Sequence, residues 1–308
     1  MTQQAIKKRR RGDFIRRSLG EKTFDVLNIL LMMALVCFFL FPILNMLSIS
    51  LSNEYAVLRG DVTFYPMGIN LQAYEQIFSH STLWQGIMNS ILVAGVGCVL
   101  SIISLSVAAY PLAFGDFYGK KLYNVLILIT MWFNGGIIPT FLTMSRLGLH
   151  NTHWALIFNT MITAYYVVIV RSYFESLPSS IVESARIDGA NDFRILFQLI
   201  IPLSKPVLAT VSLWVIVGHW NDYLNALLFI ADRSKYTLQL VLKEMVLNAE
   251  SSVYAISMSG GTDTVGAAAL GQQVRNAVLV VSMIPMVILY PFVQRYFITG
   301  VTLGAVKG

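Results

Sequence analysis

The side chains best equipped to bind a ligand lie together in one otherwise apolar stretch, GHWNDYLNALLF at 218–229. The stretch carries six polar or aromatic residues of this kind, His219, Trp220, Asn221, Asp222, Tyr223 and Asn225. Asparagine and aspartate bind sugar hydroxyls, and aromatic rings stack on the apolar faces of pyranoses. One interpretation is therefore sugar recognition. The other is a buried polar network that fixes helix packing, and the sequence leaves both open.

A second unusual segment, FNGGIIP at 133–139, interrupts another apolar stretch. Gly135 and Gly136 weaken a helix, and Pro139 removes a backbone hydrogen bond, so the pattern predicts a kink or an unwound turn. Such breaks often line the substrate path of transporters, which makes Asn134 a candidate path residue. A simple kink explains the same residues equally well.

Other chemistries lack the residues that they need. His150 and His153 lie in GLHNTHW without a carboxylate neighbour, so we predict no metal site. GDFYGKK at 115–121 has three residues between its glycines and Lys121 after its lysine, whereas a phosphate loop needs four and a Ser or Thr. The chain has neither a GxSxG nor an HExxH motif. We therefore predict no catalytic residue and no cofactor bound by this chain, and a membrane-embedded enzyme has no motif in its favour.

The composition indicates which environment positions these residues. Hydrophobic residues make up 56% of the 308 residues, charged residues 12%, and the mean hydropathy is +0.65. This is too little charge to cover a soluble globule, so we predict a membrane protein. The apolar runs are continuous rather than alternating, which favours an all-α fold. Six runs reach the length of about 20 residues that a bilayer requires. They lie at roughly 24–49, 86–110, 121–144, 153–174, 206–230 and 276–297.

The distribution of Lys and Arg predicts the orientation. With a cytoplasmic N-terminus, 16 of the 22 Lys and Arg residues fall on the cytoplasmic side, as the positive-inside tendency requires. Both termini are then cytoplasmic. The basic cluster KKRRR at 7–11 precedes a span, so anionic lipid explains it better than nucleic acid. We expect a basic N-terminal segment at 1–23, a transmembrane domain at 24–299 and a cytoplasmic tail at 300–308.

Two longer connections fall outside the membrane in this orientation. The first carries YPMGINLQAYEQIF at 65–78, whose aromatic and apolar spacing predicts a short helix at the interface. The second carries the Gly-rich SGGTDTVGAAALG at 259–271, which we expect to be a flexible loop.

A polar stretch, ESARIDGANDFRILFQLIIP at 183–202, falls on the cytoplasmic side between two apolar runs. Pro178 and the serines after it suit a helix start, and Gly189 permits a sharp turn. Asn191 or Asp192 is then suited to cap a second helix. The pattern predicts two short helices within a cytoplasmic loop at 176–205.

This stretch resembles the EAA loop of permeases from ABC importers. Glu183, Ala185, Gly189 and Pro202 match the loop, and Ser184 replaces one alanine by another small residue. ARIDGA, IPLSKPVLAT, FNGGIIPTFL and the C-terminal YFITGVTLGAVKG further resemble the smaller membrane subunit of the maltose-type carbohydrate permeases. The similarity is to the subgroup that imports complex oligosaccharides from polysaccharide breakdown.

The resemblance implies a type I importer permease with six transmembrane helices, coupled to a separate ATPase. It implies that Glu183 pairs with a basic residue of the ATPase and that Gly189 allows the bend between the coupling helices. The coupling residues would be Glu183, Ser184, Ala185, Arg186, Asp188, Gly189 and Pro202. The tail residues would contact the ATPase as well, unless they are only a frayed terminus; they are Gly304, Ala305, Val306, Lys307 and Gly308.

The implied partners are a second, homologous permease subunit, two copies of a cytoplasmic ATPase that binds ATP and Mg, and an external solute-binding protein. Oligosaccharide would be the substrate, membrane lipid the surroundings, and the bacterial cytoplasmic (inner) membrane the location. A different hypothesis is a proton-coupled secondary carrier that uses Asp222 and His219 as a relay. That hypothesis gives the cytoplasmic loop no task.

Overall fold

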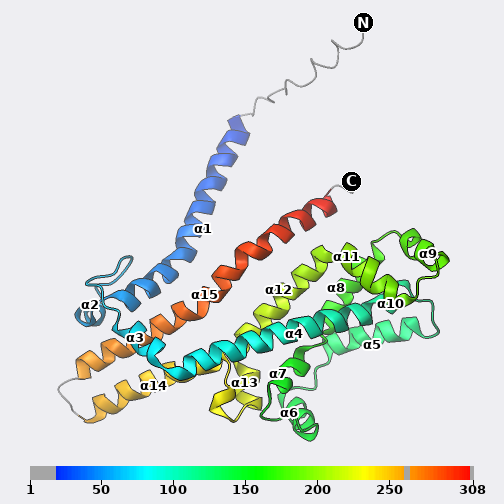
Figure 1. Ribbon diagram of the computed structural model, residues 1–308. Helices are drawn as coiled ribbons and strands as arrows, with labels where there is room; N and C mark the ends of the chain where they lie inside the picture. Colours follow the sequence, from blue (N-terminus) through cyan, green and yellow to red (C-terminus); the bar gives the residue numbers. More distant parts are fainter. Residues whose placement is uncertain (1–18, 260–263, 306–308) are drawn as a thin grey trace.

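The computed structural model describes residues 19–259 and 264–305, and this part of the chain consists of helices and turns without a strand (Figure 1). Three long helices are apolar enough to cross a membrane alone: α1 (Leu19–Leu51), α4 (Ser81–Phe114) and the apolar part of α15 (Thr264–Ala305). They correspond to the first, second and sixth predicted spans.

The other candidate spans are bent pairs of helices. α5 (Lys120–Trp132) and α6 (Ile137–Arg146) meet at 115°, and α7 (His153–Thr160) and α8 (Ala164–Glu175) meet at 50°. The helix at Asp192–Leu203 meets α12 (Lys205–Asn221) at 84°. If each pair crosses once, the described part of the chain has six spans, the number predicted from the sequence.

The break between α5 and α6 lies at the predicted segment, and a glycine causes it. Gly136 adopts φ +89° and ψ 178°, a conformation essentially restricted to glycine. Its N–H donates to Asn134 Oδ1 at 2.8 Å, which closes the turn. Pro139 lies in the first turn of α6, where an N–H has no helical partner in any case. The proline therefore fits the start of a helix rather than breaking one.

Helix α4 is the central element of the core. It packs against α8 and α12 through fully buried residues, among them Leu105, Ala109, Val170, Phe174 and Val211. Its approach to α12 depends on Gly97, because a Cβ at this position would lie 2.5 Å from Nε2 of His219. The helices that carry the candidate site are thus fixed on a well-packed α4.

Two sequence predictions are wrong in this region. The Gly-rich segment at 259–271 is not a flexible loop over its described residues, because α14 (Leu238–Ser259) precedes it and α15 already begins at Thr264. The alanines at 267–269 favour a helix, and Leu270 and Val274 add packing against α14. The fifth span, predicted to run unbroken over 206–230, ends at Asn221 and is followed by α13 (Tyr223–Phe229).

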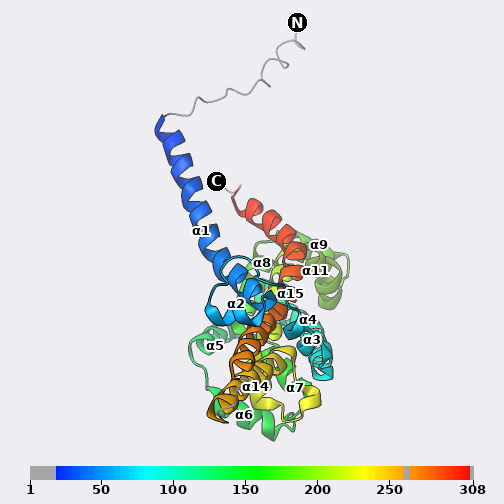
Figure 2. The same cartoon turned by 90° about the vertical axis from the view of Figure 1, so that its left-hand side faces the viewer.

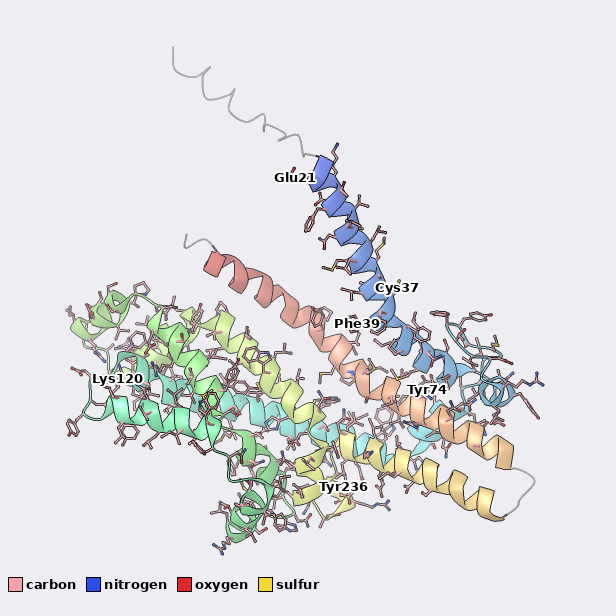
Figure 3. The ribbon with its side chains drawn as sticks, turned by 180° about the vertical axis from the view of Figure 1, so that it is seen from behind. Glu21, Cys37, Phe39, Tyr74, Lys120 and Tyr236 are labelled. Atoms are coloured by element: carbon pink, nitrogen blue, oxygen red, sulfur yellow. The ribbon has the colours of Figure 1, made fainter. Side chains whose placement is uncertain are left out.

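Helix α1 is separated from the body over most of its length. The most apolar part of residues 20–51 has a mean hydropathy of 2.7. None of that part is buried within the structure. The helix diverges from the body in both views (Figures 1 and 2), and Cys37 and Phe39 lie on this exposed part (Figure 3). Lipid or another chain must cover such a surface.

Several of the short elements lie near the two ends of α4 (Figure 1). α2 (Glu54–Arg59) and α3 (Gln72–Ser79) lie near its start, and α3 confirms the short helix predicted within 65–78. α9 (Ser179–Ile187), α10 (Asp192–Ile195), a π-helical turn (Leu196–Ile200) and α11 (Ile201–Leu203) lie near its end. A 3₁₀ turn (Arg233–Lys235) connects α13 to α14.

Candidate functional site

The polar loop at 183–202 forms two short helices joined by a sharp turn. α9 begins after Pro178, and Gly189 supplies the turn with φ +80°. Asn191 then caps the next helix by accepting a hydrogen bond from the backbone N–H of Arg194 at 2.8 Å. These local features agree with the helix start, turn and cap predicted from the sequence.

Asp192 ties this helix pair to the membrane-spanning part. Its Oδ1 accepts a hydrogen bond from the Tyr110 hydroxyl of α4 at 2.9 Å and from Nη2 of Arg186 in α9 at 3.2 Å. The hydrogen bond to Asp192 raises the pKa of the Arg186 guanidinium above its ordinary value. Apolar side chains of the same segment are buried beside Tyr110, among them Val182, Ala185, Ile195 and Leu196. These contacts join α9 and α10 directly to the packed helices α4, α8 and α12.

The opposite face of the pair is exposed. Ile187 and Phe193 are 85% and 71% exposed. Among the predicted coupling residues, Ala185 is buried, and the others are exposed: Glu183, Ser184, Arg186, Asp188, Gly189 and Pro202. Two apolar side chains within a charged surface at one end of the molecule are typical of a protein-docking face.

A polar pocket lies where the start of α6, the end of α7 and α13 come together. It encloses about 360 Å³ between α6, the end of α7 and α13. Its polar lining consists of three amides and two hydroxyls, and its apolar lining includes Leu228 and Phe229. We call it the amide pocket, and its polar residues are Asn134, Thr140, Asn159, Thr160 and Asn225.

The predicted path residues divide into three groups. Asn134 and Asn225 both line the amide pocket, although the sequence separates them by a large part of the chain. Asp222 lies directly behind Asn225 and accepts hydrogen bonds from its backbone N at 3.1 Å and from its Nδ2 at 2.7 Å. His219 is buried and does not line the pocket itself. Its Nε2 lies 3.5 Å from the hydroxyl of Thr160, which does line the pocket.

The remaining three residues are not part of the pocket lining. Trp220 packs in a separate cluster with Ile77 and Leu238. Asn221 is exposed and donates to the carbonyl of Val217 at 3.1 Å, and Tyr223 is 43% exposed. The polar stretch therefore does not act as one cluster, because a helix break at Asp222 turns its members in different directions.

Asn159, Thr140 and Thr160 were not identified from the sequence. Asn159 donates from Nδ2 to Oδ1 of Asn225 at 3.2 Å, so it extends the hydrogen-bonded chain that starts at Asp222. The available signal was the polar pair Asn159–Thr160 within the span predicted at 153–174. Such a pair inside a membrane helix indicates a protein-facing position.

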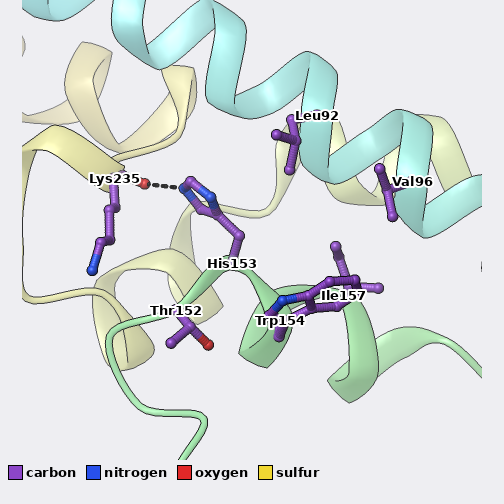
Figure 4. A pocket seen from close by; sticks show the side chains of 7 residues that line it. All are labelled: Leu92, Val96, Thr152, His153, Trp154, Ile157 and Lys235. Atoms are coloured by element: carbon purple, nitrogen blue, oxygen red, sulfur yellow. Dashed lines mark hydrogen bonds between the residues drawn. The ribbon is translucent and has the colours of Figure 1, made fainter.

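A second pocket, of about 420 Å³, has a different character (Figure 4). Its walls are mostly apolar and include Leu92, Val96 and Ile157. His153 lies at its edge and forms a hydrogen bond of 2.9 Å from Nε2 to the carbonyl oxygen of Lys235. Within the described residues, no group of three or more His, Cys, Asp or Glu side chains is placed to hold a metal ion.

The segment that resembles a phosphate loop has a different role. Lys120 donates from Nζ to the carbonyl oxygens of Ala113 at 3.2 Å and Gly115 at 3.0 Å (residue labelled in Figure 3). It therefore stabilises the C-terminal end of α4, where unpaired carbonyls and the helix dipole attract a cation.

The family model described as "Binding-protein-dependent transport system inner membrane component" matches residues 16–303. The chain belongs to this family. It is a membrane permease subunit of the ABC importer class, and the all-α type I permease fold agrees with the helices described above.

Similar proteins cover nearly the whole chain. The polygalacturonan/rhamnogalacturonan transport system permease protein YtcP of Bacillus subtilis is 36% identical over 94% of this chain and 100% of its own length. The arabinooligosaccharides transport system permease protein AraQ of Halalkalibacterium halodurans is 31% identical over the same two shares. A chain of a bacterial ABC transporter involved in the import of the acidic polysaccharide alginate is 33% identical, with a TM-score of 0.80 over 91% of this chain and 99% of that chain.

These relatives give no support to a proton-coupled carrier that works alone. In the described structure the side chains of Asp222 and His219 also bond to different partners, Asn225 and Thr160. The hypothesis of a relay between them therefore has no support from these relatives, and within the described residues no hydrogen bond joins the two side chains.

Proposed function

We propose that this chain translocates oligosaccharides across the bacterial cytoplasmic membrane as one of two homologous permease subunits. The relatives support this substrate class, because their names include polygalacturonan, rhamnogalacturonan and arabinooligosaccharides. The amide pocket supports it too, since amides and hydroxyls above an apolar wall suit a sugar ring. An external solute-binding protein would deliver the sugar, as the family description indicates.

The observation that carries the proposal is the docked helix pair α9–α10. Its inner face is buried in the core, and its outer face presents Glu183, Ile187 and Phe193. A rigid element of this kind transmits the closure of an ATPase dimer to the spans. Two copies of a separate ATPase, with ATP and Mg bound there, would supply the energy, and this chain would have no ATPase site of its own.

The orientation and the tail complete the proposal. Both termini would be cytoplasmic, so that α9–α10 and the end of α15 lie on the ATPase side. Gly304 and Ala305 end the described part of α15. Val306, Lys307 and Gly308 lie outside the described residues, and we propose that the tail contacts the ATPase.

The docking face is tested by replacing Ile187 or Phe193 with Asp in the full complex. A carboxylate in a desolvated apolar contact is costly, so we expect the ATPase to dissociate on purification and uptake to fall by about tenfold or more. Uptake is measured with labelled oligogalacturonides and arabinooligosaccharides in proteoliposomes that hold the binding protein and ATP. Collapse of the proton gradient should leave this uptake unchanged, and removal of ATP should abolish it.

Ile69→Asp is the matched control, because Ile69 is 77% exposed but lies near α3 at the other end of the molecule. It should leave the ATPase bound. If the Ile187 and Phe193 variants retain their ATPase and full uptake, α9–α10 is not the docking face.

A further inference from the structure

The amide pocket offers hydrogen bonds without offering charge. Its lining contains Asn134, Asn159 and Asn225 with two threonines, and no Lys, Arg, Asp or Glu is among its described lining residues. A carboxylate moved from water into such a pocket would need a cation to offset its desolvation. A hydroxyl needs only one donor and one acceptor, and amides supply both.

The hydrogen bonds behind the pocket fix the orientation of two of these amides. An ionised carboxylate can only accept, so the Asp222 carboxylate requires the Nδ2 group of Asn225 to face it, as the distance of 2.7 Å shows. Oδ1 of Asn225 then faces the other way and accepts from Nδ2 of Asn159 at 3.2 Å. Asn159 is thereby left with Oδ1, which receives no hydrogen bond from the described part of the chain.

The facing wall has the complementary arrangement. Oδ1 of Asn134 accepts from the N–H of Gly136 at 2.8 Å, which leaves Nδ2 of Asn134 as a donor. One wall of the pocket therefore contributes an acceptor and the other wall contributes a donor. Neighbouring hydroxyls of a sugar ring match such a pair, because each hydroxyl both donates and accepts.

We propose that the amide pocket selects an uncharged sugar ring, and that Asp222 is the positioning residue that sets this choice through Asn225 and Asn159. The inference rests on the proposed function and deepens it, since it concerns the same path. Asp222 is only partly buried behind Asn225, so its negative charge also disfavours a ligand carboxylate in the pocket. Recognition of an acidic sugar, such as the oligogalacturonides of the uptake assay, would then have to come from the external solute-binding protein.

The test compares galactotriose with trigalacturonate, which differ chiefly in the carboxylate on each ring. Binding is measured by equilibrium dialysis against the two permease subunits with their ATPase in nanodiscs, without the solute-binding protein. We expect the wild type to bind galactotriose more tightly. Asp222→Asn should weaken galactotriose binding about three- to tenfold, because an amide no longer dictates which way Asn225 turns, and should narrow the difference between the two sugars.

A double variant separates positioning from a merely structural role. In Asp222→Asn with Asn225→Asp, the new carboxylate at 225 accepts from both neighbouring amides, so Asn159 keeps its orientation. Galactotriose binding should recover toward the wild-type value, while trigalacturonate binding should stay weak. Asp232→Asn is the matched control, because Asp232 also caps a turn by accepting from Ser234 N at 3.0 Å but lies outside the pocket.

Four results would each overturn the inference. Two concern the wild type: trigalacturonate binding at least as tightly as galactotriose, or no binding of either sugar. The other two are an unchanged preference in Asp222→Asn and a double variant that binds galactotriose no better than Asp222→Asn. Failure of the proposed function is separate, because it would appear as a wild-type complex without ATP-driven uptake of any oligosaccharide.

Discussion

Gly136 sets the backbone conformation of the turn between α5 and α6, beside the amide pocket. Its φ of +89° with ψ 178° is strained for any residue with a Cβ, although no atom lies within 4 Å of a Cβ built there. Gly136→Ala should therefore destabilise the protein through its backbone alone, by about 1–3 kcal/mol. The measurement is the thermal unfolding of the purified protein together with sugar binding to the amide pocket.

Gly135→Ala is the natural comparison. A Cβ at Gly135 would meet only Pro139 Cβ at 3.7 Å, an ordinary contact, and its φ is not positive. It should change the stability little. Equal losses in the two variants would mean that the conformation of Gly136 is not what holds the turn between α5 and α6.

At this scale the sequence predicted that polar side chains would stand out in the spans, but not which of them would line one pocket. Asn134 and Asn225 were identified because polar residues stand out in apolar spans, and the structure brings both into one pocket. Trp220 was grouped with them because it is adjacent in sequence, yet it packs elsewhere. The cap at Asp222 redirects the chain after residue 221, and no helical periodicity can anticipate such a change of direction.

At the scale of helices, the contact between α4 and α12 depends on one missing side chain. A Cβ at Gly97 would lie 2.5 Å from Nε2 and 2.9 Å from Cδ2 of His219, so the ring would have to move. Gly97→Ala should destabilise the protein by about 1–3 kcal/mol, because overpacking forces the two helices apart or turns the ring. The shift in thermal unfolding temperature measures this effect.

Two further variants identify the cause. Gly95→Ala lies on the same helix with nothing within 4 Å of its Cβ, so it should be neutral or slightly stabilising. Adding His219→Ala to Gly97→Ala removes the clashing ring, and the two changes should cost less together than the sum of their separate costs. Strict additivity would contradict a direct clash.

Elements were predicted where apolar length or glycine and proline marked them. The break between α5 and α6 follows from FNGGIIP, and the turn before α10 follows from Gly189. The bend between α7 and α8 has no such marker in residues 161–163. α14 was missed because its moderate hydropathy fits neither a span nor a loop, and packing against α15 and α4 stabilises it as a helix.

At the scale of the whole molecule, the two candidate sites lie at different ends of one packed helical core. The amide pocket lies beside α6 and α13, and the docking face lies on α9–α10, with α4 and α12 between them (Figure 1). Asp192 is hydrogen-bonded to Tyr110 of α4, whose Gly97 lies against His219 of α12. A continuous set of packed helices thus connects the face proposed for the ATPase with the pocket proposed for the sugar.

This arrangement predicts opposite accessibility for the two ends of the core. In a background with Cys37→Ala and Cys98→Ala, Tyr118→Cys lies in the turn between α4 and α5, where residue 118 is fully exposed. Ala231→Cys lies in the exposed connection after α13. Because Lys and Arg favour the cytoplasmic side, a membrane-impermeant maleimide should label Ala231→Cys in intact cells and Tyr118→Cys only after permeabilisation. The reverse labelling would place α9–α10 outside the cell and remove the ATPase from the docking face.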